Sequence, residues 1–239
     1  MSAVITFLDV SKSYGGAEAV RGLSLSIETG EFITVLGASG GGKTTFLKMI
    51  NGLVEPTSGE ITVLGDSLKT ADLVQLRRKI GYAIQGSVLF PHLTVEENIA
   101  YVPNLWNKSD KARTKKAVAK WMAIVGLDAS LGGRYPAELS GGQRQRALIA
   151  MALACRPKLV IADEPTTALD VSVQAQIIAL LRRLCRQRGL SAMLITHDMG
   201  VIAETADRVM VMYEGRVIET GPVRQILDRP AHPYTRALM

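Results

Sequence analysis

The sequence predicts an α/β fold in which a mainly parallel sheet is wrapped by helices. Short apolar, β-branched runs alternate along the chain with amphipathic helical patterns, which is typical of such a sheet. One of these runs leads directly into a glycine-rich loop and then a helix. The length of 239 residues is enough to bury a substantial core without disulfides or a structural metal.

The elements of the core are inferred from apolar runs and their stop signals. A helix is expected from Lys43 to Asn51, because an apolar face follows the glycine-rich loop and Gly52 ends it. A second helix, from Ser172 to Arg188, has an apolar face and stops at Gly189. The expected buried strands are Phe32–Leu36, Ile80–Ile84, Leu159–Ala162, Ala192–Thr196 and Val209–Met212.

Two regions depart from this alternation. Residues 1–30 show short strand patterns around the turn residues Gly15-Gly16, which predicts an antiparallel β edge. Residues from about 86 to 155 have mostly helical patterns. Thr94 and Glu97 have the spacing of a capping box, which marks a helix start. A further helix is indicated by an apolar stripe at Val118, Trp121, Met122 and Val125.

These changes in pattern define the expected domain organisation. We expect one domain whose core comprises residues 1–85 and 156–221, with the antiparallel β edge attached to it. A helical lobe is expected to be inserted at about residues 86–155. Residues 222–239 would form a C-terminal tail.

Composition narrows the class of protein. The 28 Lys+Arg and 22 Asp+Glu leave a net charge of +6, which suits nucleic acid, an anionic membrane surface or a phosphate ligand. Aromatic residues are only 5%, which argues against a base-stacking platform. The longest apolar run, Ala147–Cys155, is too short to span a bilayer, and Met1–Val10 lacks the pattern of a signal peptide. A cytosolic chain with two inert thiols, Cys155 and Cys185, is expected.

The glycine-rich loop has the spacing G-x-x-x-x-G-K-[ST] between a strand and a helix. Its backbone N–H groups can surround a phosphate at the positive end of the helix dipole. Lys43 would reach the β- and γ-phosphates of a nucleoside triphosphate, and the Thr44 hydroxyl would bind Mg²⁺. The expected nucleotide-binding residues of this segment are Gly37, Ala38, Ser39, Gly40, Gly41, Gly42, Lys43, Thr44 and Thr45.

Two acids at the end of an apolar strand predict the type of reaction, which is hydrolysis of the bound nucleotide. Asp163 can hold Mg²⁺, usually through water, and Glu164 can orient or deprotonate an attacking water. A glutamate at that position favours hydrolysis over transfer to a second substrate. The alternative is a pair of surface acids at a strand end.

The segment from Leu139 to Gln143 has glycines and Ser140 at a helix start, which indicates a second anion-binding end. With this segment the sequence closely resembles the nucleotide-binding subunits of ABC transporters. The matching features follow the family's order from Tyr14 to about Gly221. They are the phosphate loop, Gln85 after a strand, the signature Leu139–Gln143, Asp163-Glu164, Ala168-Leu169-Asp170, and His197 in Thr196-His197-Asp198.

The resemblance implies a head-to-tail dimer that clamps each ATP between the phosphate loop of one subunit and the signature of the other. Tyr14 would stack on the adenine, Glu164 would act on the attacking water, and His197 would hold the γ-phosphate. The implied catalytic residues are therefore Glu164, His197 and Lys43. Asp170 would link the two sites of the dimer. The metal would be served by Thr44, Gln85 and Asp163, and the γ-phosphate would be capped from the opposite subunit by Ser140 and Gly142. Gly141 and Gln143 of the signature are also expected to be nucleotide-binding residues.

The resemblance also implies partners and a location. Gln85 would pass the nucleotide state through the helical lobe to a separate membrane permease. The second ATPase subunit would be a copy of this chain or a related one, and an extracytoplasmic solute-binding protein would act indirectly. The chain would lie at the cytoplasmic face of the inner membrane as a peripheral protein. No nucleic acid is expected.

The two ends of the chain resemble different branches of the family. Residues 1–139 look like importers of glycine betaine, choline and related osmoprotectants, for example at Leu89–Leu93. Residues 140–239 look like dipeptide, oligopeptide and nickel importers, for example at His232–Leu238. A mosaic origin is our hypothesis for this difference. The expected function is ATP-driven import of an osmoprotectant, with the peptide or nickel class as the alternative.

Two rival classes remain open on the residues alone. A soluble ABC protein acting on DNA or ribosomes usually has two ATPase halves or a long coiled-coil insertion, and this chain has neither. A P-loop kinase would have no use for Glu164 or for the Leu139–Gln143 signature.

Overall fold

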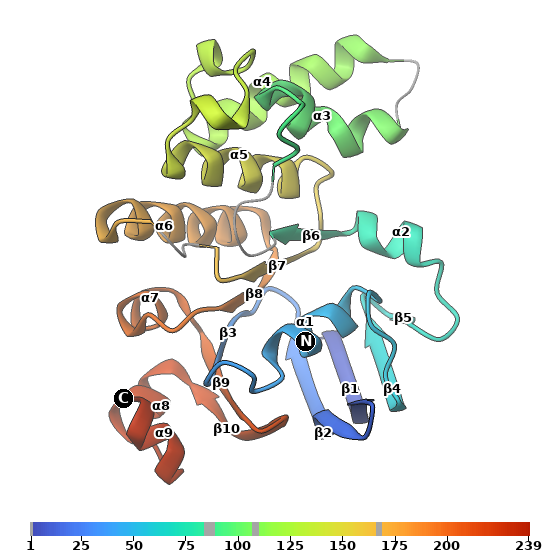
Figure 1. Ribbon diagram of the computed structural model, residues 1–239, viewed down its shortest axis with the longest axis vertical. Helices are drawn as coiled ribbons and strands as arrows, with labels where there is room; N and C mark the ends of the chain where they lie inside the picture. The colour runs from blue at the N-terminus through green and yellow to red at the C-terminus, as the bar shows by residue number, and fades with distance from the viewer. Residues whose placement is uncertain (1, 84–88, 107–109, 166–168) are drawn as a thin grey trace.

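The computed structural model describes residues 2–83, 89–106, 110–165 and 169–239. Its central sheet has the strand order β10-β9-β3-β8-β7-β6 (Figure 1). All neighbours in this sheet pair parallel except β10, which is antiparallel to β9, so the expected mainly parallel sheet is confirmed. The strands are β3 (Phe32–Leu36), β6 (Ile80–Ala83), β7 (Leu159–Asp163), β8 (Ser191–Ile195), β9 (Arg208–Tyr213) and β10 (Arg216–Pro222).

Every residue of β3, β7 and β8 is buried, as expected for strands that are covered on both faces. Alternate residues of one strand enter two different clusters, because successive side chains point to opposite faces. Val160 packs with the apolar face of α6 (Val171–Arg188), whereas Ile161 packs with α1 (Lys43–Ile50). The expected bounds of both helices are met to within one residue.

The second sheet contains the antiparallel strands predicted from residues 1–30, together with two strands at residues 58–67 that were not predicted. Its order is β2-β1-β4-β5, and the two glycines of the β1–β2 turn, Gly15 and Gly16, both have positive φ. Positive φ is costly for residues with a Cβ, which explains glycine at this turn. The strands are β1 (Ala3–Tyr14), β2 (Ala17–Glu28), β4 (Ser58–Val63) and β5 (Asp66–Ser67).

The section with helical patterns forms α3 (Val95–Trp106), α4 (Lys111–Val125) and α5 (Gly141–Leu153) at one end of the molecule (Figure 1). The predicted capping box is confirmed: the Thr94 N–H donates to Glu97 Oε2 at 2.8 Å and the Glu97 N–H donates to Thr94 Oγ1 at 3.3 Å. The predicted stripe is buried in α4, which ends at Gly126 with φ 72°. Short 3-10 turns occur at Ala129–Leu131 and Pro136–Glu138.

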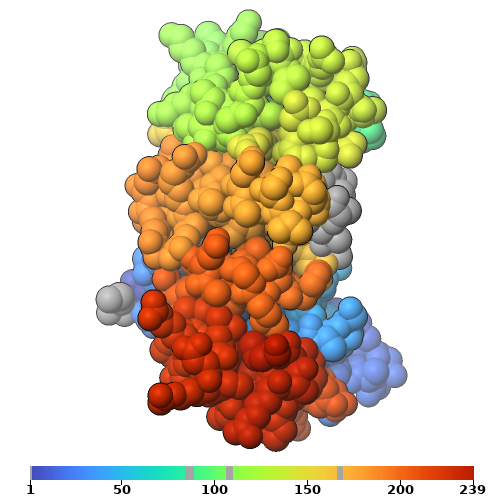
Figure 2. Space-filling view, turned by 90° about the vertical axis from the view of Figure 1, so that its left-hand side faces the viewer, coloured from blue at the N-terminus to red at the C-terminus, as the bar shows by residue number. Residues whose placement is uncertain are grey.

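The remaining helices lie along the sheet and at the opposite end. In Figure 2 the C-terminal residues form the lower end of the visible face, and the helices α3–α5 form its upper end. None of the helices in the described ranges is both long and apolar enough to cross a bilayer. The remaining helices are α2 (Leu73–Arg78), α7 (Met199–Thr205), α8 (Val223–Asp228) and α9 (Pro233–Leu238).

The parallel sheet brings distant motifs together at one edge. Because β3, β7 and β8 are parallel, their carboxyl ends meet at the same side, and Asp163 is in register with Ile195. The phosphate loop follows β3, Glu164 follows β7, and His197 follows β8 shortly after its last residue. This is the edge at which ligands bind in open α/β sheets.

Candidate active site

A cavity of about 280 Å³ opens at the carboxyl edge of the central sheet. Residues from β2, from the phosphate loop, from the start of α1 and from the end of β7 surround it. They are Ala19, Ser39, Gly40, Gly42, Lys43, Thr44, Thr45, Asp163 and Glu164. All except Ala19 belong to the set that the sequence predicts.

The phosphate loop is held tightly from outside. A Cβ at Gly37 would collide with the carbonyl oxygen of Met212, and a Cβ at Gly42 would collide with that of Ala19. Both glycines also have positive φ, at 148° and 91°. The N-cap residue Gly42 has no side chain with which to cap the first turn of α1, and Lys43, Thr44 and Thr45 of that turn line the cavity. An uncapped helix start of this kind attracts phosphate.

Lys43 is folded onto its own loop. Its Nζ donates to the carbonyl oxygens of Gly37 and Ala38, both at 2.7 Å. Burial lowers the pKa of the Lys43 ammonium, and the nearby carboxylates of Glu164 and Asp163 oppose that shift. Both of these acceptors are neutral, so the half-buried ammonium can move to a phosphate oxygen, where its charge is better compensated.

Asp163 is buried and lies beside Thr44. Burial raises the pKa of the Asp163 carboxyl; its hydrogen bond with the Thr44 hydroxyl opposes that shift, Glu164 adds to it, and Lys43 and Lys48 oppose it. A carboxylate and a hydroxyl are hard oxygen donors of the type that Mg²⁺ takes, and a cation would offset the cost of burying the carboxylate. The residues present therefore fit a magnesium ion at this position.

Glu164 turns the chain sharply after β7. It has φ 45°, in the left-handed region, and its N–H donates to the Ile195 carbonyl at 3.1 Å. Such strain is often retained where it directs a functional side chain. Glu164 Oε1 lies 4.0 Å from His197 Nδ1, and the His197 side chain is 79% exposed. Two of the three predicted catalytic residues thus lie side by side; Glu164 lines the cavity, whereas His197 is not among its described lining residues.

The signature segment lies elsewhere in the chain. Ser140 and Gln143 form a capping box at the start of α5: the Ser140 N–H donates to Gln143 Oε1 at 2.9 Å, and the Gln143 N–H donates to Ser140 Oγ at 3.3 Å. A Cβ at Gly142 would approach the Val173 side chain of α6 to 2.7 Å. Within the described ranges, neither Ser140 nor Gly141, Gly142 or Gln143 lines the cavity.

Tyr14 and Asp170 are likewise outside the cavity wall. Tyr14 ends β1, is 49% exposed, and has the Lys12 ammonium 5.0 Å from its ring centre. Asp170 caps α6 by accepting hydrogen bonds from the Val173 N–H at 2.9 Å and the Ser172 hydroxyl at 2.8 Å. These hydrogen bonds lower the pKa of the Asp170 carboxyl. Gln85 and Ala168 lie outside the described residues.

Two contacts of the site have no counterpart in the sequence motifs. The backbone of Ala19, on β2, shapes the wall at Gly42. On α6, Gln174 Nε2 donates to Asp198 Oδ2 at 2.8 Å, and Asp198 also caps α7 directly after His197. The sequence did not single out Gln174, because its hydrogen-bond partner Asp198 is distant in the chain and is brought near only when α6 packs in the fold.

Comparison with known proteins identifies the family. The model of the ABC transporter family matches residues 20–167. The chain is similar to the glycine betaine uptake system ATP-binding protein YehX of Escherichia coli, at 41% identity over 98% of this chain and 75% of that protein. It is also similar to the methionine import ATP-binding protein MetN of Caulobacter vibrioides, at 44% identity over 98% of this chain and 71% of that protein.

The fold matches solved ATP-binding cassettes. The dimeric post-hydrolysis structure of the cassette MJ0796 bound to ADP and Pi has a TM-score of 0.84 and 32% identity, covering 92% of this chain and 99% of that one. The family model, the relatives and this fold agree with the phosphate-loop cavity at the edge of the sheet. The chain therefore belongs to the ABC transporter family, as one of its ATP-hydrolysing subunits.

Proposed function

We propose that this chain powers the import of a small solute through a separate membrane permease by binding and hydrolysing ATP. The observation that carries the proposal is the convergence of Lys43, Asp163 and Glu164 on one cavity at the uncapped start of α1. The similarity to two import ATP-binding proteins supports the direction of transport. Such a subunit would lie at the cytoplasmic face of the inner membrane.

The residues at this site have separate roles in phosphate binding, metal binding and activation of the attacking water. The N–H groups of the loop and Lys43 bind the phosphates, with Lys43 exchanging its two carbonyl partners for phosphate oxygens. Thr44, Asp163 and Gln85 would hold Mg²⁺, which neutralises phosphate charge when it is bound. Glu164 orients the attacking water and accepts its proton, and His197, beside it, holds the γ-phosphate.

The signature segment would complete the site from a second subunit. Ser140, Gly141, Gly142 and Gln143 do not line the cavity of their own chain within the described ranges, and Ser140 is exposed. The dimeric state of the MJ0796 cassette supports pairing. We propose that Ser140 and Gly142 cap the γ-phosphate held by the partner, that Tyr14 stacks on the adenine, and that Asp170 links the two sites.

A mixing experiment tests this arrangement together with the ATPase activity. Ser140→Arg blocks the signature and Lys43→Ala disables the phosphate loop, so each homodimer should be inactive. In an equal mixture, one of the two composite sites of each mixed dimer is intact, and part of the hydrolysis should return. Complete inactivity of the mixture, with both proteins folded, would contradict head-to-tail pairing.

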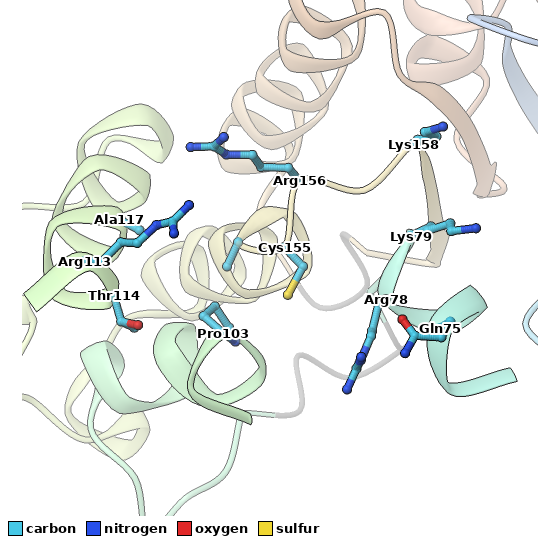
Figure 3. A pocket seen from close by; sticks show the side chains of 11 residues that line it. Gln75, Arg78, Lys79, Pro103, Arg113, Thr114, Ala117, Cys155, Arg156 and Lys158 are labelled. Atoms are coloured by element: carbon cyan, nitrogen blue, oxygen red, sulfur yellow. The ribbon is translucent and has the colours of Figure 1, made fainter. Parts of the chain in front are cut away.

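A basic cleft supports contact with the permease. It measures about 350 Å³ and lies between α2, α3, α4 and the end of α5. Figure 3 shows the side chains of Arg78, Arg113 and Arg156 around it, whereas the Lys79 amino group points away and lies 3.3 Å from Asp66. No acid is among the described residues that line it. We propose that this cleft faces the permease. Co-purification of the chain with the permease should be lost in Arg113→Glu, which changes the cleft, and kept in Lys116→Glu, which does not.

The substrate is proposed from the N-terminal part of the chain. Most of the residues that line the cleft, from Gln75 to Ala117, belong to the part that resembles osmoprotectant importers, whereas Ala154, Cys155, Arg156 and Lys158 belong to the other part. A quaternary amine such as glycine betaine is therefore the first candidate, and YehX supports it. A dipeptide, oligopeptide or nickel importer is the alternative. The MetN similarity adds methionine, a class that the motifs did not suggest. Uptake of each labelled solute, measured in cells with and without this chain, would distinguish these substrate classes. The solute would be delivered by a partner solute-binding protein.

A further inference from the structure

The outer side of the phosphate loop is bonded to the far end of the described chain. The N–H of Ala38 donates to the hydroxyl oxygen of Tyr234 at 2.9 Å. Tyr234 lies in the first turn of α9, so this bond joins two segments separated by almost the whole sequence. Figure 2 shows the C-terminal residues beside the N-terminal ones on one face of the molecule.

The Tyr234 side chain is fixed by several contacts. Its ring packs on that of Tyr213 with the centroids 4.3 Å apart. Its N–H donates to Nδ1 of His232, the N-cap residue of α9, at 3.1 Å. The turn before α9 is held by Glu219, whose carboxylate accepts from the Ala231 N–H at 2.7 Å and the His232 N–H at 3.0 Å. The hydroxyl therefore arrives at the loop in a defined position.

Ala38 is the right residue of the loop for such a contact. In the described part of the chain it does not line the cavity, whereas its neighbour Ser39 does. The bond to Tyr234 thus leaves the cavity-facing N–H groups available for phosphate. The Ala38 carbonyl accepts from Lys43, so the residue is held by Tyr234 on one side and by the catalytic lysine on the other.

The turn after β9 supports the same wall. The Gly215 N–H donates to the carbonyl of Gly41 at 3.2 Å, and the Met212 carbonyl leaves no room for a Cβ at Gly37. Met212 of β9, Gly215 after β9 and Tyr234 of α9 therefore lie against the loop on its outer side. Of these three contacts, the one from Tyr234 depends on a side-chain hydroxyl, so it can be removed without altering the backbone.

We propose that Tyr234 is a positioning residue for ATP binding, which holds the phosphate loop in its binding shape through the Ala38 N–H. A loop already held in that shape loses less conformational entropy when the phosphates bind. The inference rests on the proposed ATP site and adds the C-terminal helix α9 to it. It also requires an N–H at position 38, which a proline does not have.

The test is a double-mutant cycle on ATP affinity. Tyr234→Phe removes the acceptor but keeps the ring on Tyr213, and Ala38→Pro removes the donor. Each single change should weaken ATP binding about 3- to 10-fold, the value of one hydrogen bond, and the double variant should be no weaker than the poorer single variant. Hydrolysis at saturating ATP should stay within about twofold, since Tyr234 acts on binding. Tyr101→Phe, an exposed tyrosine on α3, is the matched control.

Hydrogen exchange gives a direct second measurement. The Ala38 amide should be protected in the unchanged protein and should exchange faster in Tyr234→Phe. An unprotected Ala38 amide in the unchanged protein, unaltered ATP affinity in Tyr234→Phe, or fully additive effects would each overturn the inference. Lys43→Ala distinguishes the two proposals: if it retains full ATP affinity the proposed function fails, whereas a silent Tyr234→Phe alone leaves that function intact.

Discussion

The starts of α1 and α5 are both glycine-rich helix ends, and they differ in how their N–H groups are used. At α1 the N-cap residue is Gly42, and no described side chain caps the first turn. At α5 the Ser140 and Gln143 side chains cap each other's backbone N–H groups. The first end is therefore open to a phosphate within the chain, whereas at the second the N–H groups of Ser140 and Gln143 are already bonded.

This difference supports the proposal that a second subunit completes the active site. The α1 end is surrounded by Lys43, Asp163 and Glu164, so binding and chemistry meet there. The α5 end is exposed and preorganised by its own capping box, which keeps the Ser140 hydroxyl on a rigid helix without help from the cavity. A rigid, exposed end of this kind is suited to a ligand held by another subunit.

The largest effect should come from Glu164→Gln, which separates binding from chemistry at the α1 end. Removing a general base costs about 10²- to 10⁴-fold in turnover, while Lys43 and the loop still bind ATP. The variant should accumulate as an ATP-bound dimer, because the α5 ends remain intact. Turnover by phosphate release and mass by light scattering provide the measurements, and near-normal turnover would remove Glu164 from its role.

Lys43→Ala should break the α1 end at the binding step. Lys43 would make charge-assisted bonds to two phosphates, and the loss of bonds of this strength weakens ATP affinity by about 100-fold or more. Titration calorimetry with Lys116→Ala, an exposed lysine on α4, as the charge-matched control would measure the loss. Unchanged affinity would mean that the loop does not bind phosphate.

Ser140→Ala should lower the stability of the chain without changing ATP binding at the α1 start. It removes one half of the capping box, so the free energy of unfolding should fall by about 1 kcal/mol. ATP affinity of the monomeric chain should stay the same, because Ser140 does not line the described cavity. Denaturant unfolding and ATP titration would be measured on the same protein. A loss of monomer affinity would show that the two ends are not independent.

The smallest effect concerns the buried carboxylate at the α1 end. Because burial raises the pKa of Asp163 above its ordinary value of 3.8, the charged form costs stability at neutral pH in the nucleotide-free protein. Asp163→Asn should therefore raise the melting temperature at about pH 7. The gain should shrink as the pH falls through the raised pKa towards 3.8, where Asp163 itself becomes neutral. Melting curves of both proteins across this pH range would show whether Asp163→Asn raises the melting temperature. A lower melting temperature of the variant at about pH 7 would contradict the prediction.

Local sequence determined much of the site. The phosphate loop, the acids at the end of β7 and the capping box at Thr94 were predicted, because each depends on residues close together in the chain. At Ser140 a glycine-rich helix start was predicted, but not its capping box. Strand and helix bounds such as those of β3 and α6 followed from apolar patterns and terminal glycines. The roles of Tyr14, Gln85 and Asp170 came from family resemblance alone and stay predictions.

Only the tertiary structure decided which motifs meet. The parallel order β3-β8-β7 places His197 beside Glu164 and leaves the signature segment at a separate surface. The contacts of Ala19 with Gly42, of Gln174 with Asp198 and of Tyr234 with Ala38 join residues that share no motif. The sequence alone could define both glycine-rich helix starts, since the loop motif and the signature segment each involve residues close together in the chain. Whether an end is surrounded by catalytic groups depends on packing between distant segments.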